Sequence, residues 1–439
     1  MRTPGVPLRF MDDKDDAKSC VRCGRCMAVC PVYGTTLREY DAPRGRLALL
    51  ENLGRSGSGS KRLKEILSRC LLCGACGEVC AAGVDTVSIL QAGRSRLFGD
   101  RGGPITGDVI ARSEWETALS KKVVTKGGTL LQALICRRIP EASGLHLRFP
   151  LRFFIKRQTV PGLSEIPFME EPKARKAAES ESARVGLFVG CGANYIFPES
   201  ARALVHILGR LGLSVAVPAE QECCGLPAYV SGNTPRAQAL ARKNIETFET
   251  AGVDTILTVC ASCGAHLQGL PHLFVEGSSW HGRAQAVAEK HRDAMAFLVE
   301  QTGLSSLFRA SRAEIEKGRP IRRVAYHDPC HLRITQGITD APRRFLEMLP
   351  GVKLMETPHE GRCCGHGGGF NLTHFDVSMD ILEKRMADLR QVSPELIVTG
   401  CTGCLLQFIE GVSRLGLEGA VRVLHPLVLA QQTLSQERG

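Results

Sequence analysis

The chain has 439 residues, and its 56 basic and 45 acidic side chains give a formal net charge of +11. This length predicts two or three domains, and a hydrophobic share of 44 % indicates a globular protein. No run approaches 18 consecutive apolar residues, which argues against a conventional membrane-spanning helix. Residues 1–18 lack the apolar core of a secretory signal. We therefore expect a cytoplasmic protein.

Cysteine is the most informative residue type, with nineteen in the chain. All but Cys136 fall into tight clusters, and the total is odd. Clustered cysteines in a long chain without a signal peptide favour binding of metal or metal clusters over disulfides. We interpret Cys136 as a small apolar filler.

The first two clusters follow the pattern C-x2-C-x2-C-x3-C. Three thiolates at this spacing hold one [4Fe–4S] cube, and the fourth reaches the other cube. The pattern predicts one cubane at Cys20, Cys23, Cys26 and Cys80, and a second at Cys70, Cys73, Cys76 and Cys30. The alternative is a pair of zinc sites, but zinc sites use two close cysteine pairs rather than two identical runs of four.

The segment between these clusters, residues 31–69, is long for a compact β-type ferredoxin. Leucine and isoleucine recur at helical spacing in residues 47–53 and 63–67, on either side of a Gly/Ser tract at 54–60. We therefore expect an all-α ferredoxin domain over residues 1–100.

Ten further cysteines form two sets of five that repeat along the chain. The sets are Cys191, Cys223, Cys224, Cys260 and Cys263, and then Cys330, Cys363, Cys364, Cys401 and Cys404. The offsets between the sets are 139 residues for the first cysteine, 140 for the adjacent pair and 141 for the C-x-x-C. Nearly constant offsets indicate a duplicated domain.

Each repeat alternates apolar runs with helical patterns, which predicts a small parallel α/β sheet. The cysteines come just after the predicted strands, where such sheets place their ligands, and each C-x-x-C begins a helix. An adjacent Cys–Cys pair does not easily give both ligands to one tetrahedral ion, but it bridges neighbouring irons in a cluster. Iron–sulfur clusters are therefore preferred over zinc in these repeats, and zinc stays the alternative.

The spacings C-x31-CC-x35-C-x-x-C and C-x32-CC-x36-C-x-x-C resemble the CCG cysteine-rich domain found in heterodisulfide reductase. With the two ferredoxin motifs and the segment DAPRGR at 41–46, the chain resembles the iron–sulfur subunits of glycolate oxidase and D-lactate dehydrogenase. The resemblance covers nearly the whole chain and is weakest over residues 83–176. It implies one or two noncubane [4Fe–4S] clusters on the ten repeated cysteines.

The resemblance also implies an electron-transfer subunit of a flavin-dependent 2-hydroxyacid dehydrogenase complex. No G-x-G-x-x-G motif follows a predicted strand and no flavin motif is visible, so we expect no flavin or nicotinamide on this chain. The partners would be an FAD-containing dehydrogenase subunit and a quinone or other acceptor. The alternatives are an enzyme like heterodisulfide reductase, which reduces a disulfide at a noncubane cluster, and the cysteine-rich subunit of an anaerobic glycerol-3-phosphate dehydrogenase.

The remaining predictions concern the linker and the histidines. Residues 101–182 are expected to be a partly helical linker, 183–276 the first cysteine-rich domain, 277–320 a helical insertion and 321–439 the second cysteine-rich domain. The linker mixes apolar and basic residues, so it packs on protein or, alternatively, lies on an anionic membrane surface; nucleic acid is not expected. We interpret His266, His331 and His366 as polar residues that line the sites, with hydrogen bonding to cluster sulfur or proton delivery as the alternative.

Overall fold

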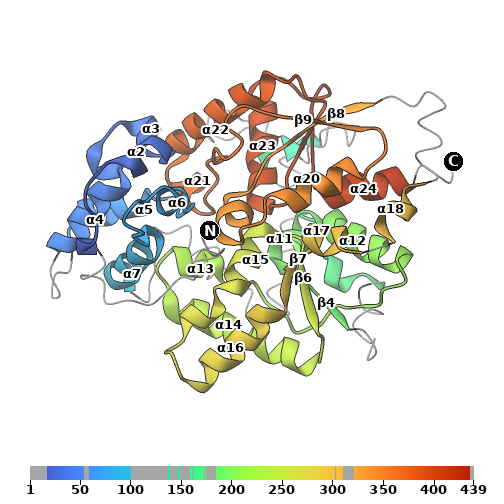
Figure 1. Cartoon of the computed structure of the whole chain (residues 1–439), viewed down its shortest axis with the longest axis horizontal. Coiled ribbons are helices and arrows are strands. Elements are labelled where there is room, and N and C mark those ends of the chain that lie inside the picture. The colour runs from blue at the N-terminus through green and yellow to red at the C-terminus, as the bar shows by residue number, and fades with distance from the viewer. Residues whose placement is uncertain are drawn as a thin grey trace.

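The computed structural model describes residues 17–53, 59–99, 162–172, 174, 184–301, 303–309 and 321–435, and the pairs 137–138, 147–148 and 159–160. A small helical domain packs against two larger α/β units (Figure 1). The predicted fold class, a helical ferredoxin-type domain followed by a duplicated parallel α/β domain, is confirmed. Of the described helices, none combines the length and apolar character that crossing a membrane requires.

Short helices build the N-terminal domain. They are α2 (Arg25–Val29), α3 (Tyr33–Thr36), η1 (Glu39–Asp41), α4 (Pro43–Asn52), α5 (Lys61–Ser68), α6 (Ala75–Glu78) and α7 (Thr86–Phe98). Gly24 and Gly74 precede α2 and α6 with φ of 83° each, a left-handed conformation that glycine adopts without strain. In α5 the side chains of Leu63, Ile66 and Leu67 are buried, as their helical spacing predicts.

The first α/β unit has a four-stranded parallel sheet. Its strands are β4 (Val185–Phe188), β5 (Val215–Ala216), β6 (Thr255–Thr258) and β7 (His291–Asp293), in the order β5-β4-β6-β7. Its helices are α11 (Gly190–Tyr195), α12 (Pro198–Arg210), α13 (Leu226–Val230), α14 (Thr234–Thr250), α15 (Ala261–Gln268), η5 (Leu270–Leu273), α16 (Ser279–Lys290), α17 (Ala294–Val299) and α18 (Leu304–Leu307).

The second α/β unit repeats this topology. Strands β8 (Arg322–Tyr326), β9 (Val352–Met355), β10 (Leu396–Val398) and β11 (Arg422–Leu424) are parallel and follow the equivalent order β9-β8-β10-β11. The other elements are η6 (His331–Thr335), α20 (Asp340–Glu347), α21 (Phe370–Thr373), α22 (Phe375–Arg390), α23 (Thr402–Arg414) and α24 (Pro426–Ser435). One buried apolar cluster extends through both units, so they share a continuous core.

Two expectations from the sequence need adjustment. The segment 277–320 does contain helices, but it also contains β7, which pairs with β6 and completes the first sheet. The part of this segment that contains β7 therefore belongs to the first repeat, because β7 occupies the place that β11 occupies in the second sheet. Strand β7 escaped prediction because it is three residues long and follows directly on α16.

The expected linker, residues 101–182, lies mostly outside the described residues, as does Cys136. Three described pairs in it are strands rather than helix: β1 (Arg137–Arg138), β2 (Leu147–Arg148) and β3 (Thr159–Val160) form a small antiparallel sheet. Thr159 of β3 donates two hydrogen bonds to Glu410 of α23, at 2.9 and 2.7 Å. A described part of the linker therefore packs on the second repeat. Another described element there is η4 (Phe168–Glu170).

Acidification should weaken the fold through His291. Burial lowers the pKa of this imidazole to about 3, while the unfolded chain takes up the proton near its ordinary value of about 6.5. Stability from this residue is therefore complete above about pH 6.5 and is lost as the pH falls below it. Between about pH 7.5 and about pH 5.5, it should account for a decrease of about 1.4 kcal/mol in the free energy of unfolding.

The measurement is urea unfolding of the wild type and of His291→Gln at both pH values. The variant should show a smaller dependence on pH by that amount. His281→Gln, in the neighbouring helix α16, is the matched control and should behave as the wild type. Equal pH dependence in the wild type and His291→Gln would contradict the prediction.

Candidate metal centres

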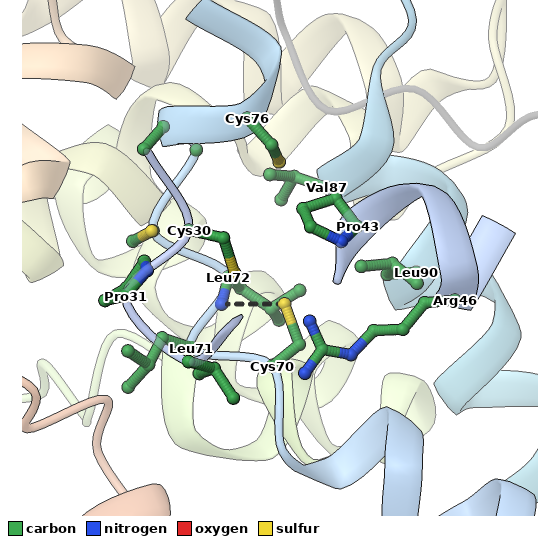
Figure 2. Close-up of a pocket in the computed structure, with 14 residues that line it drawn as sticks. Cys30, Pro31, Pro43, Arg46, Cys70, Leu71, Leu72, Cys76, Val87 and Leu90 are labelled. Atoms are coloured by element: carbon green, nitrogen blue, oxygen red, sulfur yellow. Dashed lines mark hydrogen bonds between the residues drawn. The ribbon is translucent and has the colours of Figure 1, made fainter. Parts of the chain in front are cut away.

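The second N-terminal motif and one cysteine of the first motif line a common pocket. Figure 2 shows this pocket, with Cys30 from the loop after α2, Cys70 and Cys76, and Cys73 lines it as well. Cys30 and Cys76 are buried, and the backbone N–H of Leu72 donates to the Cys70 sulfur at 3.4 Å. The structure therefore brings together the four thiols that the sequence predicts for the second cubane.

Another pocket holds the other predicted set. Cys20, Cys23, Cys26 and Cys80 line it, together with Cys76, Gly24 and Arg44. Helices α2 and α6 contact each other, which places each motif's fourth cysteine beside the other motif. A Cβ on Gly24 would lie 2.9 Å from the Arg44 guanidinium, so the glycine lets the loop approach that charge closely. Of these thiols, Cys23 is exposed at the surface.

The electrostatics of the pocket in Figure 2 favour a bound group that is positively charged. Burial, together with the charges of nearby Cys70 and Cys30, raises the pKa of Cys76 to about 12. Burial also raises the pKa of Cys30, although the Arg46 guanidinium works against this shift. Figure 2 shows Arg46 pointing toward Cys70. Four crowded thiols become thiolates only with compensation, and bound iron supplies it, so the donor set fits an iron–sulfur cluster.

In the first repeat, the five cysteines meet at the carboxyl ends of three neighbouring strands. Cys191 follows β4, the Cys223–Cys224 pair follows β5, and Cys260 and Cys263 follow β6. Hydrogen bonds from Cys191 and Cys224 lower the pKa of Cys223, and Cys224 in turn contacts Cys263. Cys191 is exposed, whereas Cys224, Cys260 and Cys263 are buried.

The second repeat builds the same arrangement on β8, β9 and β10. Hydrogen bonds from Cys330 and Cys364 lower the pKa of Cys363. The sulfurs of Cys364 and Cys404 are 3.3 Å apart, too far for a disulfide. All eighteen described cysteines are free thiols.

The two five-cysteine sets adjoin each other. The thiols of Cys260 and Cys401 are hydrogen-bonded, and the backbone N–H of Thr402 also donates to Cys260. Around them, Ser262 Oγ lies 3.3 Å from Cys401 Sγ and 2.9 Å from His331 Nδ1. The amino-terminal ends of α15 and α23, which follow these cysteines, therefore face each other across the boundary between the repeats.

The second repeat also contacts the N-terminal domain at its cysteines. Cys73 interacts electrostatically with two of them: the charge of Cys363 raises the pKa of Cys73, and the charge of Cys73 raises the pKa of Cys330. The surrounding interface includes an ion pair between Arg333 and Glu78 at 2.7 Å. A Cβ on Gly367 would lie 2.3 Å from a Leu71 side-chain carbon, so the two surfaces meet without a gap there. The pocket that Cys73 lines is thus next to the cysteines of the second repeat.

Four histidines lie near these thiols, and sequence reasoning missed one. His331 bonds Ser262, and a Cβ on Gly403 would lie 2.8 Å from His366 Nδ1. Burial lowers the pKa of His266 to about 4, and neither of its ring nitrogens has a hydrogen-bond partner among the described residues. The missed residue is His327, which is grouped with Cys364 and Cys404. His327 stands three residues before Cys330, but a single histidine in a strand-like run has no spacing pattern that marks it.

Comparison of the sequence with known protein families agrees with the four cysteine groups described above. A model described as "4Fe-4S dicluster domain" matches residues 16–84, and one described as "Cysteine-rich domain" matches residues 185–268 and 324–409. The chain is thus an iron–sulfur protein with a ferredoxin-type domain and two cysteine-rich domains. These matches support iron–sulfur clusters rather than the zinc alternative.

Curated relatives narrow the family. The chain is 29 % identical over 420 residues to a "Probable glycolate oxidase iron-sulfur subunit" from Bacillus subtilis, covering 94 % of this chain and 93 % of that protein. It is 27 % identical over 443 residues to the "Glycolate oxidase iron-sulfur subunit" of Escherichia coli, covering 98 % and 97 %. It is 31 % identical over 242 residues to "Lactate utilization protein A" from Geobacillus kaustophilus, covering 55 % and 96 %. The chain belongs to this family of glycolate oxidase and lactate utilization iron–sulfur proteins.

Proposed function

We propose that the chain is the electron-transfer subunit of a flavin-dependent 2-hydroxyacid dehydrogenase complex, with glycolate or D-lactate as the substrate oxidised on a partner chain. The observation that carries this proposal is the continuous series of four cysteine groups. The pocket with Cys20 adjoins the pocket with Cys70, Cys73 lies close enough to Cys363 to interact with it electrostatically, and the Cys401 thiol is hydrogen-bonded to Cys260. Such a series serves electron transfer between two exposed ends, at Cys23 and Cys191.

The residues would divide into four clusters. Two cubane [4Fe–4S] clusters would be held by Cys20, Cys23, Cys26 and Cys80, and by Cys70, Cys73, Cys76 and Cys30. Two noncubane clusters would be held by the five-cysteine sets. These groups supply one-electron chemistry when bound, and the chain positions them and buries eight of their eighteen thiols.

A separate flavoprotein would oxidise the hydroxyacid, because a hydroxyacid releases two electrons and a cluster accepts one at a time. The names of the relatives support this partner, since they are iron–sulfur subunits of glycolate oxidase. A quinone or another carrier would receive the electrons. A place in the cytoplasm, with contact to the inner face of the membrane, agrees with this role and is part of the proposal.

The test is anaerobic purification from the native host, followed by iron and sulfide analysis and identification of bound proteins. About sixteen irons per chain and a bound flavoprotein support the proposal. Addition of D-lactate or glycolate to the complex should then reduce the clusters, seen as bleaching of visible absorption. A colourless protein that contains zinc would contradict it.

A second function is reduction of a disulfide at the cysteine-rich sites, as in heterodisulfide reductase. One observation favours it: the two five-cysteine sets face each other through Cys260 and Cys401, and Cys191 of the first set is exposed. It predicts that added thiols or disulfides change the EPR signal of a noncubane cluster. If no thiol changes the spectrum while a hydroxyacid-linked flavoprotein reduces the clusters, electron transfer alone is the function. The third alternative, a role in an anaerobic glycerol-3-phosphate dehydrogenase, predicts reduction by that substrate.

A further inference from the structure

The second five-cysteine set has a buried histidine beside it. His327 directly follows β8, and its side chain is fully buried. One of its ring nitrogens and the sulfurs of Cys364 and Cys404 all lie within 4.8 Å of one another. Yet neither ring nitrogen has a hydrogen-bond partner in the part of the chain that the structure describes. An imidazole buried in this way destabilises the fold unless a partner satisfies its polar atoms.

Packing holds the ring at this place. The backbone N–H of His327 donates to the carbonyl of Val398 in the neighbouring strand at 2.9 Å. The ring meets the Phe408 ring edge-on, with centroids 4.7 Å apart and planes at 71°. The side chain therefore cannot turn to solvent without disturbing the core, and one of its ring nitrogens stays close to the two thiols.

The first repeat has no donor at the equivalent place. Phe188, which precedes Cys191 by the same three residues, replaces the histidine. A Cβ on Gly190 would lie 3.4 Å from the Phe188 ring and 2.9 Å from Cys263 Sγ, so this ring also lies beside a C-x-x-C thiol. The buried histidine of the first set, His266, approaches from another side, near Cys223 and the Tyr229 ring. The two five-cysteine sets thus differ in the position of the buried imidazole beside them.

We propose that His327 makes direct contact with the iron–sulfur group held by the second set and raises its reduction potential. This inference rests on the proposed function, since it requires a cluster on Cys330, Cys363, Cys364, Cys401 and Cys404. An imidazole N–H that donates to a cluster sulfur raises the potential, and so does a neutral imidazole that takes the place of a thiolate on iron. Both modes of contact therefore predict the same direction of change.

The experiment compares the anaerobic holoprotein with His327→Phe, which copies the first repeat, and with His327→Gln, which keeps an N–H. In an EPR-monitored redox titration, the signal of the second set should shift to a more negative midpoint potential in His327→Phe and shift less in His327→Gln. The other three signals should not move. Pulsed EPR should show nitrogen coupling at this cluster that His327→Phe removes; a large coupling marks an iron ligand and a small one marks a hydrogen bond.

Several outcomes would overturn the inference. An unchanged potential and unchanged nitrogen coupling in His327→Phe, at full iron content, overturns it and leaves the proposed function intact. An iron content of about eight in the wild type would remove the second-set cluster and, with it, both this inference and the four-cluster proposal. Loss of the second-set signal in both variants, with no nitrogen coupling in the wild type, would mark a folding role in place of contact. His266→Phe is the matched control, because an equal shift of the second-set signal in that variant would show a general effect of charge or packing.

Discussion

Cys363→Ser should stop electrons from reaching the first five-cysteine set, although both N-terminal clusters stay reducible. Cys363 is a thiol of the second repeat that interacts electrostatically with Cys73, and its own pKa is lowered by hydrogen bonds from Cys330 and Cys364. Serine offers a poorer ligand to iron than a thiolate. Loss of this ligand should remove the cluster that stands between the N-terminal domain and the first repeat.

The expected result is loss of about four irons per chain and of electron transfer to the first set, while reduction of the two cubanes is unchanged. Iron analysis measures the loss of irons. Freeze-quench EPR after mixing with a reduced donor measures reduction of the cubanes and of the first set in one experiment. Cys136→Ser is the matched control, because Cys136 belongs to none of the four groups, and it should behave as the wild type. If Cys363→Ser still reduces the first set at the normal rate, the four groups do not act in series.

The sequence predicted each cysteine group because its members are separated by short, regular spacings. A run such as Cys70, Cys73 and Cys76 is local, so helix and loop geometry alone brings its thiols together. The contact between Cys260 and Cys401 was not predicted. It joins residues 141 apart in the sequence and depends on how the two sheets pack. The electrostatic interaction of Cys73 with Cys363 was not predicted either, because it too joins residues that are far apart in the sequence.

The strands were predictable where they were apolar and stood before a cysteine, as in β4, β6, β8 and β10. Strand β7 was missed because its residues, His291, Arg292 and Asp293, are polar. They form a strand because β6 offers a free parallel edge, and the buried His291 bonds Thr258 at 2.9 Å. Tertiary pairing therefore overrides local propensity here. His327 was missed for a related reason: one histidine in a strand-like run carries no spacing signal.

Arg94→Met should destabilise the N-terminal domain by about 3 kcal/mol or more. Arg94 in α7 is buried, and burial lowers its pKa to about 10. Its guanidinium donates to the carbonyls of Leu67, Ser68 and Cys70, at 2.7, 3.3 and 2.5 Å, and to Val230 of the first repeat at 2.8 Å. Methionine keeps the apolar stem but leaves these acceptors without a charged donor, and buried acceptors without donors are costly.

The structure also predicts where the damage from Arg94→Met appears first. The guanidinium holds the carbonyl of Cys70, which is a proposed ligand of the second cubane and not of the first. The EPR signal of the second cubane should therefore be lost at lower urea concentration than the signal of the first. Arg62→Met is the control, because Arg62 is exposed on α5 and pairs with Glu65 at the surface, where such a pair contributes little to stability. Simultaneous loss of both cubanes in Arg94→Met would instead mean that Arg94 supports the whole domain and not the Cys70 loop.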